Sequence, residues 1–322
     1  MLSVVLSYGL SGIEGFPVRV EVNLSRGLTQ FELVGLPDAA VKESRERVRT
    51  AIKNCGFPFP DGRLTINLAP ADQKKEGPAF DLPMAVGILA ASGGIMPEAL
   101  KDTALLGELS LDGSVRAVRG VLPMTISARE QGVKRILVPE ANAGEVRCIE
   151  GIKIYPVPSR RAAFLHLRGE EKIAPLETVE YRRLLGERMP QVDFSHVKGQ
   201  KSAKRALEIA AAGGHNVIMI GPPGSGKTLM ARCMPTILPD MTFEEALETT
   251  RIHSAAGLMD GGTLLVERPF RTPHHTASSV SLIGGGTHAT PGEISKAHNG
   301  VVFPKHADGD LVVSTKNRTK AA

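Results

Sequence analysis

The stretch from Gly221 to Thr228, GPPGSGKT, has the residue types and spacing of a loop that binds phosphate groups. In such a loop, backbone N–H groups at the start of a helix point at phosphate oxygens, and the helix dipole favours negative charge there. The Lys227 ammonium would reach the β- and γ-phosphates, and the Thr228 hydroxyl would hold Mg²⁺. The predicted nucleotide-binding residues are Gly221, Pro222, Pro223, Gly224, Ser225, Gly226, Lys227 and Thr228.

The elements on both sides of this loop support the prediction. The apolar stretch 217–220 predicts a strand that runs directly into the loop. Residues 229–234, after the loop, predict a helix. A further helix is expected over 200–212. Gly224 and Gly226 allow the backbone to close around phosphates without a Cβ clash. This context favours nucleotide binding over a glycine-rich loop that only turns the chain.

A second stretch, Asn299–Asp310, begins like the other half of a nucleotide-hydrolysing site. Gly300–Phe303 predicts a short buried strand. An ATPase with a phosphate loop needs an acid at the end of such a strand to organise Mg²⁺. This chain has Pro304, Lys305 and His306 there, so the sequence predicts no intact catalytic residue at this strand.

Three other groups of residues are weaker candidates. His274 and His275 could ligate a metal, but neighbouring histidines point in different directions and no third ligand is evident. Gly284–Gly286 could approach a ligand, although a flexible loop is the default. Glu293 and His298 could form an acid–base pair, but such isolated pairs are common. In each case the structural interpretation is favoured.

Composition excludes several classes of protein. The three cysteines, Cys55, Cys148 and Cys233, lie far apart and form no C-x-x-C pair, which argues against a zinc site or a disulfide framework. No apolar run approaches the roughly 20 residues that a membrane span needs. The net charge of +5 indicates only weakly a nucleic-acid partner.

The first part of the chain predicts a mixed α+β domain. Residues 18–24 and 64–68 alternate apolar and polar side chains, which is typical of half-buried strands. Asp38 is a predicted N-cap for an amphipathic helix that runs to Asn54. A second helix is expected over 81–91, and Asp112-Gly113 predicts a hairpin turn. The expected buried side of the first helix is Val41, Val48, Ala51 and Ile52.

These patterns predict four segments. Residues 1–167 form the N-terminal domain, and the charged, proline-containing stretch 168–192 is a linker with room for one short helix. Residues 193–303 form the N-terminal part of a nucleotide-binding domain. Residues 304–322 are interpreted as an unrelated tail.

Four long strings give the chain a specific resemblance. They are FELVGLPDAAVKESRERVRTAIKNCGFPFP, ALEIAAAGGHNVIMIGPPGSGKTLMA, RPFRTPHHTASSVSLIGGG and PGEISKAHNGVVF. Over residues 1–303 the chain resembles the ComM/YifB family of magnesium-chelatase-like AAA+ ATPases. The resemblance implies ATP and Mg²⁺ as cofactors, a cytoplasmic homo-hexamer with no membrane contact, and ATP-driven branch migration of DNA in recombination and natural transformation.

The implied fold is α/β and α+β, with a Lon-protease-like (ribosomal S5 domain 2-like) N-terminal domain and an incomplete P-loop AAA+ domain. In the Lon comparison, Ala79 in KKEGPAFDLP takes the place of the serine nucleophile, and Leu122 matches the catalytic lysine. Without a hydroxyl and an amine the dyad cannot form. The N-terminal domain is therefore interpreted as a pseudo-protease that serves assembly or DNA contact.

The resemblance also shows which residues the chain lacks after Phe303. Family members continue the strand with Leu-Asp-Glu, which places the Walker B acids at Lys305 and His306. From Pro304 the chain departs from the family pattern, as a frameshift or premature end would produce, and it lacks the arginine finger. The predicted strand at 217–220 then loses both usual neighbours. Asp310–Thr315 could pair with Gly300–Phe303, which would not replace them.

Three functions stay open from the sequence. The first is the family role, an ATP-driven DNA translocase acting on branched or single-stranded DNA. The second is chelatase-type remodelling of a protein partner. The third is a non-enzymatic truncated fragment that binds nucleotide or partners without turnover, and it is favoured for this chain because Lys305 and His306 replace the acids.

Overall fold

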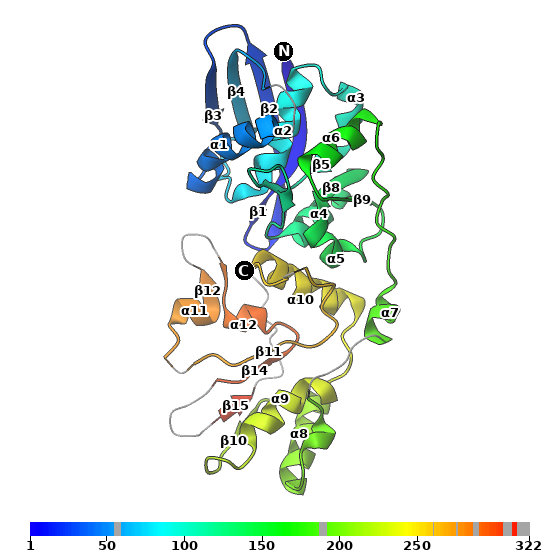
Figure 1. Cartoon of the computed structure of the whole chain (residues 1–322). Helices are drawn as coiled ribbons and strands as arrows, with labels where there is room; N and C mark the ends of the chain where they lie inside the picture. Colours follow the sequence, from blue (N-terminus) through cyan, green and yellow to red (C-terminus); the bar gives the residue numbers. More distant parts are fainter. Residues whose placement is uncertain are drawn as a thin grey trace. The chain divides into compact units, whose positions relative to one another are not determined.

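The computed structural model describes residues 1–54, 59–186, 192–259, 261–274, 276–285, 290–304 and the backbone of 311–313. The chain divides into two compact units (Figure 1). The first consists of Met1–Thr178 with Gly257–Thr263, and the second of Val179–Ala256 with Leu264–Ala322. The predicted boundaries at residues 167, 192 and 303 stay predictions.

The first unit is built on a seven-stranded mixed sheet with strand order β3-β4-β2-β1-β5-β8-β9. Strands β1, β2 and β4 pair antiparallel, whereas β3 with β4 and the run β1-β5-β8-β9 pair in parallel. The strands are β1 (Leu2–Ser11), β2 (Glu14–Ser25), β3 (Gln30–Val34), β4 (Arg63–Ala69), β5 (Thr103–Leu105), β8 (Arg135–Pro139) and β9 (Lys153–Val157). The two strands predicted at 18–24 and 64–68 are confirmed as parts of β2 and β4.

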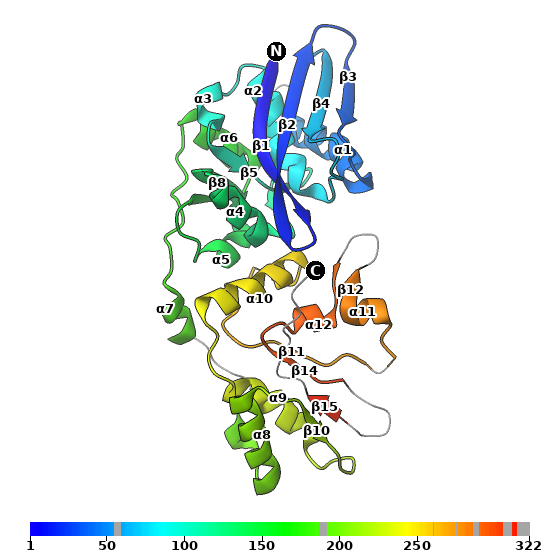
Figure 2. The ribbon, with the colours of Figure 1, turned by 180° about the vertical axis from the view of Figure 1, so that it is seen from behind.

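Helices α1 and α2 cover one face of this sheet (Figure 2). The predicted cap of α1 is confirmed, because the Asp38 Oδ1 accepts the Val41 N–H at 2.7 Å. The bounds are α1 (Ala39–Asn54), α2 (Asp81–Ala91), α3 (Pro97–Leu100), α4 (Val121–Glu130), α5 (Ala143–Val146) and α6 (Arg160–Arg168). The expected buried residues of α1 are all in the core: Val41, Val48, Ala51 and Ile52.

The core of the first unit explains why α2 is apolar on every side. All of its residues are buried, between the sheet and helices α1 and α6. A Cβ at Gly87 would lie 2.6 Å from Val22 Cγ2, so glycine allows α2 to approach the sheet closely. The predicted hairpin turn at Asp112-Gly113 is also confirmed, since it joins β6 (Glu108–Leu109) to β7 (Val115–Arg116).

The second unit contains helices and short strand pairs. A short helix, α7 (Tyr181–Gly186), forms within the predicted linker. The other elements are α8 (Lys201–Gly213), β10 (Val217–Met219), α9 (Lys227–Ile237), α10 (Phe243–Ala255), β11 (Phe270–Arg271), α11 (Ser279–Ile283), β12 (Gly284–Gly285), β13 (Thr290–Pro291), α12 (Glu293–Lys296), β14 (Val301–Val302) and β15 (Leu311–Val313). Strands β11 and β14 pair in parallel, and β12 and β13 pair antiparallel.

One apolar cluster packs together the elements around the predicted nucleotide-binding loop. It joins side chains of α8, α9 and β14 and packs against β10 and β11. Its buried members are Phe194, Val197, Leu207, Ala211, Met230, Ala231, Cys233, Met234, Val301 and Phe303. The strand predicted at Gly300–Phe303 is therefore confirmed as a buried strand in the same core as α9.

The last strand does not take the partner that the sequence suggested as possible. The sequence allowed Asp310–Thr315 to pair with Gly300–Phe303, but β15 pairs antiparallel with β10, with Ile218 opposite Val312. Strand β14 instead pairs with β11. Backbone N–H and C=O groups without partners are costly to bury, so pairing with one neighbour satisfies part of the backbone of each strand. Strand β10 therefore has a neighbour that the sequence did not predict.

Within the described ranges, no helix is both long enough and apolar enough to cross a membrane.

Candidate nucleotide-binding site

The predicted phosphate-binding loop connects β10 to α9, as the sequence indicates. Gly224 and Gly226 have φ values of 80° and 88°, in the left-handed region that favours glycine. Helix α9 begins at Lys227, and its first backbone bond runs from the Met230 N–H to the Gly226 carbonyl at 2.9 Å. The first N–H groups of a helix have no partner inside it, so they stay available for an anion at this end.

The Lys227 side chain is folded against its own loop. Its Nζ donates hydrogen bonds to the carbonyl oxygens of Gly221 and Pro222, the latter at 3.0 Å. The side chain is buried, with 9% of its surface exposed. A buried ammonium needs hydrogen-bond partners, and the two loop carbonyls supply them. The loop is thereby held closed around the residue that would meet the phosphates.

Two hydroxyls complete the predicted set. The Ser225 Oγ is buried and has no hydrogen-bond partner among the described residues. An unpaired buried hydroxyl is unfavourable unless a ligand satisfies it. Thr228 lies exposed in the first turn of α9, where its hydroxyl is open to a metal-bound phosphate. The residues present therefore fit a nucleotide with Mg²⁺.

The remaining loop residues lie at the surface. Pro222, Pro223 and Gly224 are exposed, and Gly221 is half-buried beside the Ser225 side chain. A Cβ at Gly221 would lie 3.3 Å from the Ser225 Oγ. These residues lie between β10 and α9, and their role in nucleotide binding stays a prediction. The sequence gave no sign that Lys227 binds the loop carbonyls.

The strand expected to carry the Walker B acids ends in the core. Val301, Val302 and Phe303 are buried, and the Phe303 ring lies 5.9 Å from that of Phe270. Lys305 and His306 lie outside the described residues. Their assignment to the acid positions therefore stays a prediction from the sequence.

Arg268 fixes the start of β14, a role that the sequence did not reveal. Its Nη1 donates to the Asn299 carbonyl at 2.7 Å, and its Nη2 pairs with the Glu245 carboxylate at 2.9 Å. Its Nε donates to the Pro239 carbonyl at 2.7 Å. One guanidinium thus holds the N-terminal end of α10 beside the turn that enters β14.

Glu293 and His298 do not form the acid–base pair considered from the sequence. The Glu293 carboxylate accepts two hydrogen bonds from Arg271, at 2.8 and 3.0 Å, and one from Lys296 at 3.2 Å. The bond from Arg271 is the main reason that the pKa of Glu293 lies below its ordinary value. His298 instead contacts Glu248, at 3.1 Å. Glu293 is therefore an ionised structural partner.

The other weak candidates also have structural surroundings. The His274 Nδ1 lies 2.7 Å from the Thr276 Oγ1, while His275 is outside the described residues. Gly284 and Gly285 form β12, and Gly286 is not described. In the described part of the chain, no group of three His, Cys, Asp or Glu residues could hold a metal ion.

Comparisons with known proteins match both the N-terminal unit and the segment that contains the predicted phosphate-binding loop. A family model described as subunit ChlI of Mg-chelatase matches residues 20–142, and one described as magnesium chelatase, subunit ChlI, matches residues 193–307. The chain is 43% identical to the YifB protein of Escherichia coli K12 over 303 residues, which is 94% of this chain. It is 42% identical to the competence protein ComM of Haemophilus influenzae over 304 residues, also 94% of this chain. The chain belongs to the ComM/YifB family of magnesium-chelatase-like AAA+ proteins.

The chain spans about three-fifths of the length of the ComM and YifB relatives that it matches. The aligned region covers 59% of YifB and 59% of ComM. The chain has a second, more distant similarity: Lon protease 2 of Bacillus subtilis is 30% identical over 138 residues, which is 41% of this chain and 24% of that protease. The Lon similarity is therefore confined to part of this family member.

The two positions compared with the Lon dyad are apolar and buried in this family member. Ala79 lies in a short 3-10 helix, Pro78–Phe80, with 7% of its surface exposed. Leu122 lies on α4 and is fully buried. Neither side chain can act as a nucleophile or a base. Cys148 and Cys233 are buried free thiols, and burial raises the pKa of both.

Proposed function

We propose that this chain binds ATP with Mg²⁺ at Gly221–Thr228, as an AAA+ protein of the ComM/YifB type. The observation that carries the proposal is the Lys227 side chain, which begins α9 and bonds to the loop carbonyls of Gly221 and Pro222. The phosphates of ATP would offer this ammonium stronger, charged acceptors. The unpaired Ser225 Oγ gives the loop a further donor.

We also propose that the bound nucleotide is hydrolysed at no measurable rate. Phosphoryl transfer in such sites depends on positioning and on charge stabilisation around Mg²⁺. By the family resemblance, Lys305 would place a positive charge where the family carries the metal-organising Asp, and His306 would stand in for the Glu that polarises water. A chain of this kind would act by binding nucleotide and partners, without turnover.

For the family, as distinct from this chain without turnover, we propose ATP-driven branch migration of DNA during recombination and natural transformation. Support comes from the similarity to the competence protein ComM and from the positive net charge of +5. The homo-hexamer and the cytoplasmic location belong to the same proposal. The four predicted segments, 1–167, 168–192, 193–303 and 304–322, are retained with it as the proposed domain division.

Remodelling of a protein partner is a second candidate. It is favoured by the two family models, both described as the ChlI subunit of magnesium chelatase. The two candidates differ in the macromolecule that changes nucleotide affinity. Single-stranded DNA should raise the affinity for ATP under the first proposal and leave it unchanged under the second.

Binding of a fluorescent N-methylanthraniloyl ATP analogue tests the proposal. Lys227→Ala should weaken binding about 10- to 100-fold, since one charge-assisted hydrogen bond contributes about 1.5–3 kcal/mol. The exposed Lys201, at the start of α8, gives a matched control as Lys201→Ala. Equal affinities for the wild type and Lys227→Ala would contradict the ATP site. Phosphate release that depends on Lys227 would contradict the absence of turnover.

A further inference from the structure

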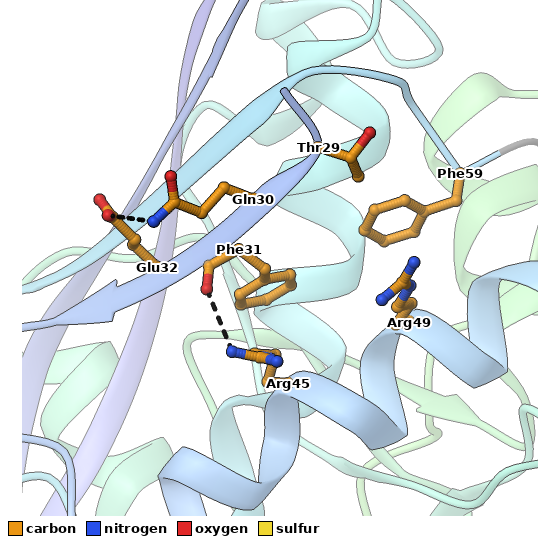
Figure 3. Close-up of a pocket in the computed structure, with 7 residues that line it drawn as sticks. All are labelled: Thr29, Gln30, Phe31, Glu32, Arg45, Arg49 and Phe59. Atoms are coloured by element: carbon orange, nitrogen blue, oxygen red, sulfur yellow. Dashed lines mark hydrogen bonds between the residues drawn. The ribbon is translucent and has the colours of Figure 1, made fainter. Parts of the chain in front are cut away.

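A pocket in the first unit lies between the edge strand β3 and helix α1 (Figure 3). Its volume is about 370 Å³, within the range of about 300–1,000 Å³ that is typical of small-molecule sites. Strand β3 is the last strand of the seven-stranded sheet on this side. None of the residues that line the pocket belongs to the nucleotide-binding loop.

Two arginines of α1 line this pocket. Arg45 and Arg49 are four residues apart and therefore lie on the same face of the helix. Among the described residues, Arg49 has no carboxylate partner, and its guanidinium carbon lies 5.8 Å from the centre of the Phe59 ring. Arg45 pairs with Glu46 at 3.2 Å, but both side chains are more than half exposed, so this ion pair contributes little. Arg45 Nη1 also donates a long hydrogen bond, 3.5 Å, to the Phe31 carbonyl. A guanidinium has five N–H donors, so Arg45 keeps donors beyond these two contacts, and Arg49 keeps its donors, to meet an anion.

Two aromatic rings lie beside the arginines. Phe31 on β3 and Phe59 both pack against the core of the first unit yet stay partly exposed. Figure 3 shows Arg45 beside Phe31 and Arg49 beside Phe59. Aromatic rings combined with arginines are the usual means by which proteins hold an unpaired base and its phosphate. Rings that served only the core would not need two cations at their exposed edges.

Among the described residues that line the pocket, Glu32 is the one acid, and it is already neutralised. The Glu32 carboxylate accepts bonds from Arg63 at 3.1 and 3.2 Å and from the Gln30 amide at 2.9 Å. It therefore does not cancel the charge of Arg45 and Arg49. The Gln30 side chain adds an amide that can meet the polar edge of a base.

We propose that this pocket binds one nucleotide unit with an unpaired base. The phosphate lies against Arg45 and Arg49, and the base lies against Phe31 and Phe59. A free nucleotide and a single-stranded nucleic acid share this chemistry, and the experiment separates them. The proposal shares with the proposed function only the choice of nucleic acid as partner, because it uses no residue of the ATP loop.

The test is the fluorescence anisotropy of a fluorescein-labelled single-stranded oligothymidylate mixed with the full chain, without ATP. Arg45→Gln/Arg49→Gln should weaken binding at least about tenfold. The slope of log affinity against log salt concentration should also become shallower by about 1 to 2. Lys42→Gln/Lys53→Gln is the matched control, because it removes the same charge from exposed positions of α1 outside the pocket. The control should change affinity less than about threefold.

The aromatic part of the proposal has its own variant. Phe59→Leu keeps an apolar side chain but removes the ring, and it should weaken binding about 5- to 100-fold, as the loss of one stacked base does. Unlabelled oligothymidylate should compete better than duplex DNA of the same length, in which the bases are already paired. Thermal unfolding of each variant shows whether the first unit is still folded.

Competition with dTMP identifies the source of the ligand. Displacement by dTMP at micromolar concentration supports a free nucleotide, and displacement by the oligonucleotide alone supports a nucleic-acid strand. Equal competition by polyglutamate together with full binding by Phe59→Leu would overturn the proposal and indicate an acidic peptide. Loss of oligonucleotide binding in Lys227→Ala would place the site in the ATP loop and also overturn it. Normal oligonucleotide binding by a chain that fails to bind ATP would contradict the proposed function alone.

Discussion

The Arg47 guanidinium and the Asp81 carboxylate form a two-point ion pair that ties α1 to α2, with Nε 2.7 Å from Oδ2 and Nη2 3.2 Å from Oδ1. Asp81 is fully buried and also accepts the Leu109 N–H at 3.2 Å. Arg47 makes a further bond to the Ser44 Oγ at 2.8 Å. The pair therefore joins α1, α2 and β6 at one buried carboxylate.

Replacement of Arg47 by Met should destabilise the first unit by about 2–4 kcal/mol. Removal of one partner of a buried pair leaves an uncompensated charge, which typically costs about 3–5 kcal/mol, and the partial exposure of Arg47 reduces that cost. Urea unfolding of the full chain, followed by circular dichroism, measures the change. Arg19→Met, at an exposed position of β2, is the control, and an equal loss there would contradict this role of the pair.

Ser225→Ala should separate nucleotide affinity from stability. Because the Ser225 Oγ has no partner among the described residues, its removal should leave the melting temperature without ligand unchanged or slightly higher. If the hydroxyl donates to a phosphate, the ATP-induced rise in melting temperature should shrink, with affinity about 10-fold weaker. Thermal melts with and without Mg-ATP check both parts. An undiminished ATP shift would show that Ser225 does not contact the nucleotide.

Local patterns in the sequence predicted the elements of the first unit well. The cap at Asp38 and the buried face of α1 follow from short-range spacing, and the structure confirms them. The long-range relationships could not be predicted. Nothing in the local pattern indicates that Arg47 reaches Asp81, or that Arg268 holds Asn299, because these partners are 34 and 31 residues apart.

In the candidate site, too, local features were predictable from the sequence and long-range contacts were not. The sequence predicts a helix after the loop over 229–234, and the structure starts α9 two residues earlier, at Lys227. The pairing of β15 with β10 was missed because apolar strands carry little information about their partners. The pocket of Arg45 and Phe59 was missed because its members lie on separate elements and match no motif.

Acid should weaken the second unit through His253. Burial lowers the pKa of His253 below its ordinary value, and the nearby Arg271 and Lys296 lower it further, while its bond to the Lys296 carbonyl and Glu293 oppose the shift. The unfolded chain therefore binds a proton at a pH where the folded chain does not. The stability that neutral His253 provides is complete above the unfolded pKa, about 6.5, and is lost as the pH falls below it.

His253→Gln should flatten this loss of stability between pH 7.5 and 5.5, because the amide can still donate to the Lys296 carbonyl but does not titrate in this range. Burial also lowers the pKa of His166 in the first unit, so part of the loss remains. The measurement is urea unfolding at several pH values. The exposed His274, changed to Gln, is the control, and an equally flattened curve for that variant would assign the effect elsewhere.

The apolar strand that enters the nucleotide loop should make the chain prone to aggregate. In β10 and directly after it, Ile218 and Ile220 are 66% and 80% exposed. Exposed apolar side chains on a short strand favour edge-to-edge association between copies. Ile220→Lys should therefore lower the aggregated fraction while it changes the free energy of unfolding by less than about 0.5 kcal/mol, as is usual for surface positions.

Light scattering after size-exclusion chromatography measures the aggregated fraction over a range of protein concentrations. Ile283→Lys, which adds the same charge at a 67% exposed isoleucine of α11, is the matched control. A general effect of charge on solubility would lower aggregation equally in both variants. A larger reduction in Ile220→Lys assigns the association to β10. An equal aggregated fraction in both variants and the wild type would show that this strand does not associate. Ile220 would then be free to contact a ligand bound at the loop.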